Sequence, residues 1–535
     1  MQIFKKSLGS LLLPILLISL FNSCKTQVAI DDTTVFRYNE HANITSLDPA
    51  FAKDQRNIWA CNLLYNGLVK LDHNLNVIPD LAQSWLVSDD AMTYTFYLKE
   101  HLYFHSASGD TAFAKAEQVT SLDFKFSLER LMDPDLASPA SWTMQYVEQI
   151  TAPAPQTLII KLNQPYPAFL GVLTMKYCSV IPQSTSSEEL RSVPRGTGPF
   201  YLKRWEENVK MVMRKNPFYH EHDKDGARLP YLEAVAITFK NDKQSEFLEF
   251  TQGNLDFING LDPSYKDELL TTNGKLKERY RSSINLVKAP FLNTEYLGMN
   301  LSNPNSLLNN IHLRNAINLG FDRVKMMKYL RNNIGTPATM GFVPDGLPGG
   351  GVVKGFSYDL NKARKELQTF KDETGIQQPV INIATGANYL DLCEFIQKEL
   401  QSVGIAVVIE VMPPSSLRQA RKAGQLEIFR SSWIADYPDA ENYLALFYSR
   451  NYPPSGSNYS YFTDADYDLL YEQSISIKDP ETRKKLYVQM DSIIVAKSAT
   501  IPLYYDQSVR FVSKEVSGFS SNATNLLDLT RVQKK

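Results

Sequence analysis

Ten consecutive residues, Arg430 to Asp439, combine side chains that could bind a ligand with two opposite charges. They follow an apolar run, 426–429, that predicts a buried strand. In open α/β sheets, ligands bind beyond the carboxyl ends of the strands. Asp436 beside Trp433 suits an ammonium group, through charge-assisted hydrogen bonds and cation–π attraction, and Arg430 suits a carboxylate. A ligand that carries both groups is a peptide or an amino acid.

The same segment also allows a structural interpretation, in which it is a turn with solvated charges. Asp439 lies three residues after Asp436 and competes with it as the partner of an ammonium group. The segment alone does not decide between these alternatives, and the rest of the sequence is needed to distinguish them.

The N-terminus predicts export. Lys5 and Lys6 precede an apolar stretch, 11–21, that is too short for the roughly 20 residues that span a bilayer. Phe21-Asn22-Ser23-Cys24 then resembles a bacterial lipobox. We therefore expect a signal peptide at 1–23 and lipid on the Cys24 thiol, which would hold an otherwise soluble protein at a membrane, in the periplasm or at the cell surface. The alternative is a plain signal peptide with an incidental cysteine.

Composition limits the partners. The chain has 56 Lys plus Arg and 58 Asp plus Glu, and this balance argues against nucleic acid as a ligand. The 535 residues are enough for two to four domain units. Cys61, Cys178 and Cys393 are too few and too scattered for a disulfide framework, and we expect each to be a small buried residue.

The C-terminal half predicts an α/β lobe. Apolar strands at 380–384 and 405–411 flank a helix whose apolar positions run from Tyr389 to Val403, with Gly404 as its stop. Such a unit makes two parallel strands. A further helix is expected from 359 to 370.

The first half has more strand character. Strands are expected at 94–98 and 158–162, and a capping box at Thr120 to Asp123 predicts a helix over 124–131. The segment 195–200 predicts a tight turn ahead of a strand.

Metal and catalytic signals are weak. His101 and His105, and the run His220-Glu221-His222, lack the three or four converging ligands that a metal site needs, so we expect no metal and no cofactor. The sequence contains no G-x-S-x-G, S-x-x-K or H-E-x-x-H motif, which favours a protein that is not an enzyme. An exported hydrolase with a triad assembled in space is the alternative.

Matching stretches in one order resemble a known family. They are Ser46-Leu47-Asp48-Pro49, 62–68, 79–85, 126–131, Gly196-Thr197-Gly198-Pro199-Phe200, Asp322-Arg323 and 433–439. The chain resembles the bacterial extracellular solute-binding proteins of family 5, the oligopeptide- and dipeptide-binding lipoproteins of ABC importers.

The resemblance implies an α/β fold of the large, type II-like periplasmic-binding-protein class. Two lobes joined by a hinge would close around the ligand, and a small domain would be inserted into the first lobe. The implied segments are 24–57, 194–287 and 500–535 for lobe I, 58–193 for the inserted domain, and 288–499 for lobe II.

The resemblance also implies the ligand and the partners. An extended peptide would lie between the lobes of a monomeric protein and be delivered to permease subunits in the inner membrane. Asp436 would hold the α-ammonium, Arg430 the carboxylate, and Lys53, Asp54 and Gln55 would contribute backbone contacts from lobe I. Some related binders take oligosaccharides, nickel or haem, so a non-peptide solute is the alternative ligand.

Overall fold

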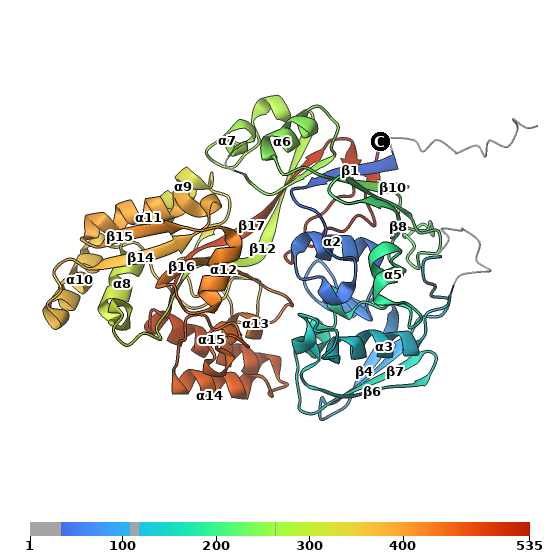
Figure 1. Ribbon diagram of the computed structural model, residues 1–535, viewed down its shortest axis with the longest axis horizontal. Coiled ribbons are helices and arrows are strands. Elements are labelled where there is room, and N and C mark those ends of the chain that lie inside the picture. The colour runs from blue at the N-terminus through green and yellow to red at the C-terminus, as the bar shows by residue number, and fades with distance from the viewer. Residues whose placement is uncertain (1–33, 107–116, 263) are drawn as a thin grey trace, which may run out of the picture.

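The computed structural model describes residues 34–106, 117–262 and 264–535. The predicted signal peptide and Cys24 lie outside this range. Figure 1 shows two halves, and two long strands, β12 (Ile284–Met299) and β17 (Thr500–Ser513), run from one to the other. We call the half that contains residue 34 and the C-terminus lobe I, which carries the inserted domain, and the other half lobe II. Within lobe II, Cys393 is buried, as Cys61 and Cys178 are in the other half, in agreement with the prediction.

One large mixed sheet extends through both lobes. Its strands, in spatial order, are β15 (Ala406–Val411), β14 (Val380–Thr385), β16 (Ile428–Ile434), β12, β17, β11 (Phe257–Asn259), β1 (Val35–Glu40), β10 (Ala234–Phe239), β9 (Lys210–Lys215) and β8 (Phe200–Glu206), with β13 (Thr336–Pro337) paired to β17. β14 is parallel to both β15 and β16, whereas β12 is antiparallel to β16 and β17.

The predicted elements of lobe II are confirmed. Helix α11 (Leu390–Val403) connects β14 to β15 and ends at Gly404, whose φ of 111° is a left-handed conformation that favours glycine. Helix α10 (Leu360–Thr374) begins at the N-cap Asp359 and continues four residues beyond the predicted end. The other helices of this lobe are α8 (Ile311–Leu319), α9 (Arg323–Leu330), α12 (Pro414–Lys422), α13 (Glu441–Leu444), α14 (Ala465–Ser474) and α15 (Pro480–Ala496).

The extent of β16 corrects one expectation. The strand was predicted to end at Arg430, but it continues to Ile434 because β12 supplies antiparallel partners along its whole length, from Met299 opposite Ile428 to Asn293 opposite Ile434. Arg430 and Trp433 therefore lie within the strand, while Asp436 lies beyond its carboxyl end. Tertiary pairing overrides the polar sequence of this segment.

Lobe I and the inserted domain have separate cores. The first core includes Phe36, Trp59, Phe200 and Val512, around helix α2 (Gln55–Leu64). The second lies between α3 (Ser121–Met132) and a four-stranded antiparallel sheet. The strands of that sheet are β4 (Ala82–Val87), β5 (Thr93–Leu98), β7 (Thr157–Leu162) and β6 (Val147–Ala154). The predicted strands at 94–98 and 158–162 and the capping box of Thr120 and Asp123 are all present.

Smaller elements complete these two units. They are β2 (Val69–Leu71), β3 (Val77–Pro79), α4 (Phe169–Val172), α5 (Ser187–Ser192), α6 (Lys243–Thr251), α7 (Lys266–Leu269), β18 (Val516–Ser517) and β19 (Gln533–Lys534). Helix α2 packs in the lobe I core. Buried residues belong to the lobe I core up to Tyr65, then to the core of the inserted domain, and again to the lobe I core from Ile181. The segment boundaries given above at 57/58 and 193/194 stay predictions.

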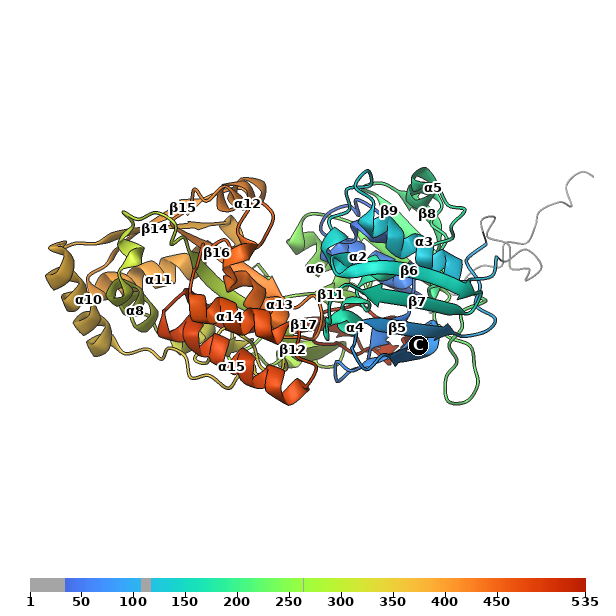
Figure 2. The same ribbon diagram turned by 90° about the horizontal axis from the view of Figure 1, so that it is seen from below.

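The pairing of β12 with β17 is irregular where it passes between the lobes. The register shifts between Pro290 and Thr294 and again between Glu295 and Tyr296. Bulges of this kind bend a strand and increase its twist. Figure 2 shows the two lobes on either side of this stretch. The described residues form no helix with the length and apolar content needed to cross a membrane.

The turn before β8 explains one of the recurrent sequence stretches. Gly196 and Gly198 lie against the carboxyl end of α2, where the Gly198 amide donates to the Leu64 carbonyl at 2.9 Å. A Cβ atom on Gly198 would lie 2.4 Å from the Leu64 carbonyl carbon. No side chain fits there without moving the backbone of α2.

We expect Gly198→Ala to lower the free energy of unfolding by about 1–3 kcal/mol or more, since it overpacks a backbone contact. Gly386→Ala is the matched control, because a Cβ on Gly386 meets nothing within 4 Å, and it should change stability by less than about 0.5 kcal/mol. Urea denaturation measures both. Equal stability of the two variants would contradict the packing argument.

Candidate functional site

The acidic and aromatic side chains of the loop between β16 and α13 differ in how far they are buried. Asp436 stays accessible to solvent, whereas Tyr437 and Asp439 are 3% and 8% exposed. The two carboxylates of this loop therefore have different environments and different partners.

Asp436 is accessible but closely surrounded by protein. Desolvation raises the pKa of its carboxyl to about 6, and a hydrogen bond from Asn442 opposes that rise. Asn442 Nδ2 lies 3.5 Å from Asp436 Oδ2, and the Asp436 amide donates to Asn442 Oδ1 at 3.3 Å. The carboxylate is mostly charged at pH 7 and accessible, so it can attract a cationic ligand.

Trp433 is fixed by two residues that the sequence did not single out. Its Nε1 donates to Asn442 Oδ1 at 2.8 Å. The Tyr443 hydroxyl lies 2.7 Å from the Trp433 carbonyl oxygen and 2.9 Å from the Leu292 carbonyl oxygen, which share its single proton. Asn442 thus holds both Trp433 and Asp436. The only sequence signal for this role is its place just after the loop, in a short helix whose residues all face inward.

Asp439 has a structural role. Its carboxylate is ion-paired with Arg483 and accepts a hydrogen bond of 2.6 Å from the Tyr487 hydroxyl. It also accepts from the Glu441 amide at 3.0 Å at the start of α13. These partners occupy the carboxylate, so Asp436 is the carboxylate of this loop that stays available to a ligand.

Arg430 is also engaged. Its guanidinium is ion-paired with Glu295 on β12 and lies 3.2 Å from the centroid of the Tyr389 ring. Arg331 and Asp506 lie in the same buried cluster, 3.8 Å apart. Burial lowers the pKa of Arg430, but nearby negative charge, above all that of Glu295, outweighs it and raises the pKa above its usual value. A ligand carboxylate would have to share Arg430 with Glu295.

The predicted contacts of lobe I lie at the start of α2. Lys53 is exposed, the Asp54 carboxylate is 3.9 Å from the Arg56 guanidinium, and Gln55 Nε2 donates to the Asn525 carbonyl at 3.0 Å.

The Tyr177 hydroxyl of the inserted domain is affected by carboxylates of both lobes. Burial, and then the charges of Asp436 and Asp54, raise the pKa of the Tyr177 hydroxyl. The charges of Asp54 in lobe I and of Asp436 in lobe II thus both act on a tyrosine of the inserted domain. Sequence reasoning did not identify Tyr177.

His220 and Glu221 converge with Asp80, but His222 does not join them. His220 Nε2 lies 3.4 Å from Asp80 Oδ1 and 3.9 Å from Glu221 Oε1. The Lys70 ammonium already pairs with Glu221, and it interacts favourably with Asp80 as well. Lys70 thus supplies a cation to this pair of carboxylates between the inserted domain and lobe I.

His101 and His105 do not form a pair. His101 is exposed, whereas His105 is buried with Nε2 3.0 Å from the Gly198 carbonyl and Nδ1 accepting from the Gly196 amide at 3.2 Å. Burial lowers the pKa of His105 to about 4, so it is a neutral structural residue that supports the glycine turn.

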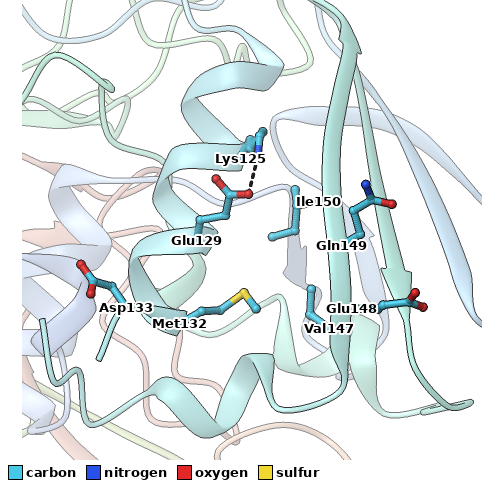
Figure 3. Close-up of a pocket in the computed structure, with 8 residues that line it drawn as sticks. All are labelled: Lys125, Glu129, Met132, Asp133, Val147, Glu148, Gln149 and Ile150. Atoms are coloured by element: carbon cyan, nitrogen blue, oxygen red, sulfur yellow. Dashed lines mark hydrogen bonds and ion pairs between the residues drawn. The ribbon is translucent and has the colours of Figure 1, made fainter. Parts of the chain in front are cut away.

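A surface pocket of about 430 Å³ lies on the inserted domain, between α3 and β6 (Figure 3). Its lining comprises Lys125, Glu129, Met132 and Asp133 at one side and residues 147–150 at the other, with Lys125 and Glu129 paired to each other. None of the predicted ligand contacts lines it.

Comparisons with known proteins settle the family. The model of the bacterial extracellular solute-binding proteins, family 5, matches residues 76–454. This chain belongs to that family. Family 5 proteins bind solutes and are not enzymes, and they act outside the cytoplasm with ABC-type importers. The family assignment and the absence of enzymatic function agree with the sequence analysis.

Relatives match along most of the chain. The glutathione-binding protein GsiB of Escherichia coli K12 is 26% identical over 487 residues, with 89% of this chain and 90% of GsiB covered. A probable di/tripeptide-binding protein of Pseudomonas aeruginosa is 25% identical over 504 residues, covering 89% and 91%. The periplasmic binding protein DppA of Helicobacter pylori, solved in complex with the peptide STSA, aligns with a TM-score of 0.78 and 24% identity, covering 94% and 98%. The predicted α/β binding-protein fold is thereby confirmed.

We expect Asn442→Leu to raise the pKa of Asp436 above its value of about 6, by roughly half a unit or more, because leucine fills the same space without the hydrogen bond. Carbon-13 NMR titration of the aspartate carboxyls measures the shift.

Asn451→Leu is the control for this substitution. Asn451 donates to the Ala445 carbonyl at 3.0 Å in the same lobe and has no hydrogen bond to Asp436. An Asp436 pKa that is the same in wild type and Asn442→Leu would show that Asn442 does not tune this carboxylate.

Proposed function

We propose that this protein captures oligo- or dipeptides between its two lobes and delivers them to the permease of an ABC importer. The observation that carries the proposal is Asp436, an accessible carboxylate beside Trp433, at the carboxyl end of β16. Such a site binds an ammonium group through charge-assisted hydrogen bonds and cation–π attraction. A peptide α-ammonium is the group that fits an importer of this family.

The remaining ligand contacts form part of the same proposal. Asp54, with Lys53 and Gln55, would contact the peptide from lobe I, and Tyr177 would lie near its amino terminus. Arg430 would attract the peptide carboxylate while paired with Glu295, so its contribution would be smaller than that of a free arginine. Backbone contacts give affinity without reading the sequence, which suits an importer of varied peptides.

Anchoring by lipid on Cys24 completes the proposal. The basic residues, the short apolar stretch and the lipobox-like sequence support it. The protein would then act as a monomer tethered at a membrane surface, close to the transporter.

Asp436→Asn should weaken the binding of tri-alanine by roughly a hundredfold, because an interfacial charge pair that loses one partner costs about 2–5 kcal/mol. Asp439→Asn should lower the melting temperature, since it breaks the pair with Arg483, but change peptide affinity much less. Isothermal titration calorimetry with tri-alanine and with N-acetyl-tri-alanine measures both effects.

The pH dependence of peptide affinity shows whether Asp436 acts through its negative charge or only through its shape. The peptide α-ammonium, with an ordinary pKa of about 7.7–8.0, begins to lose its own proton towards pH 8, so wild-type affinity should be highest near pH 7. The ligand also needs the ionised carboxylate, so protons compete with it below the Asp436 pKa of about 6, and affinity should fall about tenfold per pH unit there. Asp436→Asn should remove this dependence. If Asp436→Asn binds free and acetylated peptides as tightly as wild type does, the assignment of Asp436 is wrong and a non-peptide solute becomes the better candidate.

Cys24→Ser should release the protein into the soluble periplasmic fraction or leave its signal peptide uncleaved, because serine offers no thiol for lipid attachment. Membrane fractionation and the mass of the mature chain distinguish these outcomes. Cys178→Ser, at a buried cysteine of the inserted domain, is the control and should stay membrane-bound. A processed Cys24→Ser variant that remains on the membrane would place the anchor elsewhere.

A further inference from the structure

The inserted domain and lobe II meet at the residue that follows Asp436. Tyr437 belongs to lobe II, yet it is buried among the core residues of the inserted domain. Its ring centroid lies 6.1 Å from that of Trp142. A Cβ on Gly171, in α4, would lie 3.5 Å from both Tyr437 Cβ and Pro438 Cδ, so the two backbones are closely apposed there. Figure 2 shows α4 and α13 at the adjoining edges of the two halves.

A buried carboxylate organises the contact. Glu441 is 6% exposed and accepts hydrogen bonds from the hydroxyls of Tyr437 and Tyr471, both in lobe II. Tyr166 of the inserted domain reaches the same group, with its hydroxyl 3.4 Å from Glu441 Oε2 and 3.2 Å from the Tyr437 hydroxyl. A buried carboxylate is costly unless its oxygens are well hydrogen-bonded, and here three phenols surround it.

The contact lies next to Asp436 in the sequence, within the short loop between β16 and α13. Asp436 directly precedes Tyr437, and Asp439 is anchored two residues later by Arg483 and Tyr487. Any motion of the inserted domain away from lobe II withdraws Tyr166 from Tyr437 and Glu441. The loop that carries Asp436 is then held only by contacts within lobe II, such as those of Asp439 with Arg483 and Tyr487.

We propose that Tyr166, Tyr437 and Glu441 form an interdomain latch, which favours the state with the inserted domain closed onto lobe II and holds the Asp436 loop in position. Tyr166 is a positioning residue in this proposal, because it acts on Asp436 through Tyr437. The link to peptide capture rests on the proposed function, but the latch itself is a property of the protein without ligand.

Tyr166→Phe removes the hydroxyl that crosses between the domains and keeps the ring. The ratio of closed to open molecules should fall about two- to tenfold, as expected for the loss of one or two hydrogen bonds. In the full-length protein without ligand, amide hydrogen exchange over residues 436–443 should accelerate by a similar factor, and the radius of gyration from small-angle scattering should increase.

Tyr448→Phe is the matched control. It removes a phenol that donates to a carboxylate, Glu472, at 2.7 Å, but both residues lie in lobe II. Its exchange rates over 436–443 and its scattering profile should equal those of wild type. The latch is overturned if Tyr166→Phe exchanges and scatters as wild type does, or if Tyr448→Phe produces the same changes.

Binding then separates the latch from the proposed function. With tri-alanine as the probe, Tyr166→Phe should dissociate about two- to tenfold faster than wild type, while Tyr448→Phe should not. A protein that binds no peptide but shows the difference in exchange supports the latch and refutes the peptide assignment. A protein that binds peptide with unchanged exchange and dissociation in Tyr166→Phe refutes the latch and leaves the peptide assignment intact.

Discussion

The antiparallel pairing of β12 with β17 is the constraint on which the rest of the structure depends. These strands belong to the cores of both lobes, and β12 is also the partner that extends β16 as far as Ile434. Without that partner, the strand would not extend to Trp433, and Asp436 would not follow an ordered strand end. The register shifts around Pro290 and Thr294 interrupt the ladder between the lobes, where a closing motion would bend the chain.

The loop between β16 and α13 shows how neighbouring carboxylates acquire different environments. Asp439 and Glu441 are buried and saturated with donors, and they fix the loop to α15 and to the inserted domain. Asp436 keeps solvent access but loses enough hydration to raise its pKa to about 6. Because the buried groups hold the backbone rigid, the remaining carboxylate is presented in a defined place. Support of this kind reduces the conformational entropy that the loop itself would lose on binding a ligand.

The sequence predicted the elements whose signals are local. Gly404 ends α11, Asp359 caps α10, and the box of Thr120 and Asp123 begins α3, since each depends on residues within one helical turn. The carboxyl end of β16 was missed because its partner strand lies more than 100 residues away in the chain.

The same reason explains the gaps in the candidate site. Glu295, which pairs with Arg430, and Tyr177, which lies near Asp436, are distant in sequence and carry no motif. Asn442 is close to Asp436 in sequence, but its role depends on how a four-residue helix turns back toward Trp433.

The identity of the natural ligand tests the account most directly. The protein should be purified from its own host without denaturation, and any bound compound released by acid and sequenced by tandem mass spectrometry. Our account predicts short peptides with free amino termini and varied sequences, present in wild type and depleted in Asp436→Asn. Recovery of a sugar, a haem or a metal complex in place of peptides would contradict it.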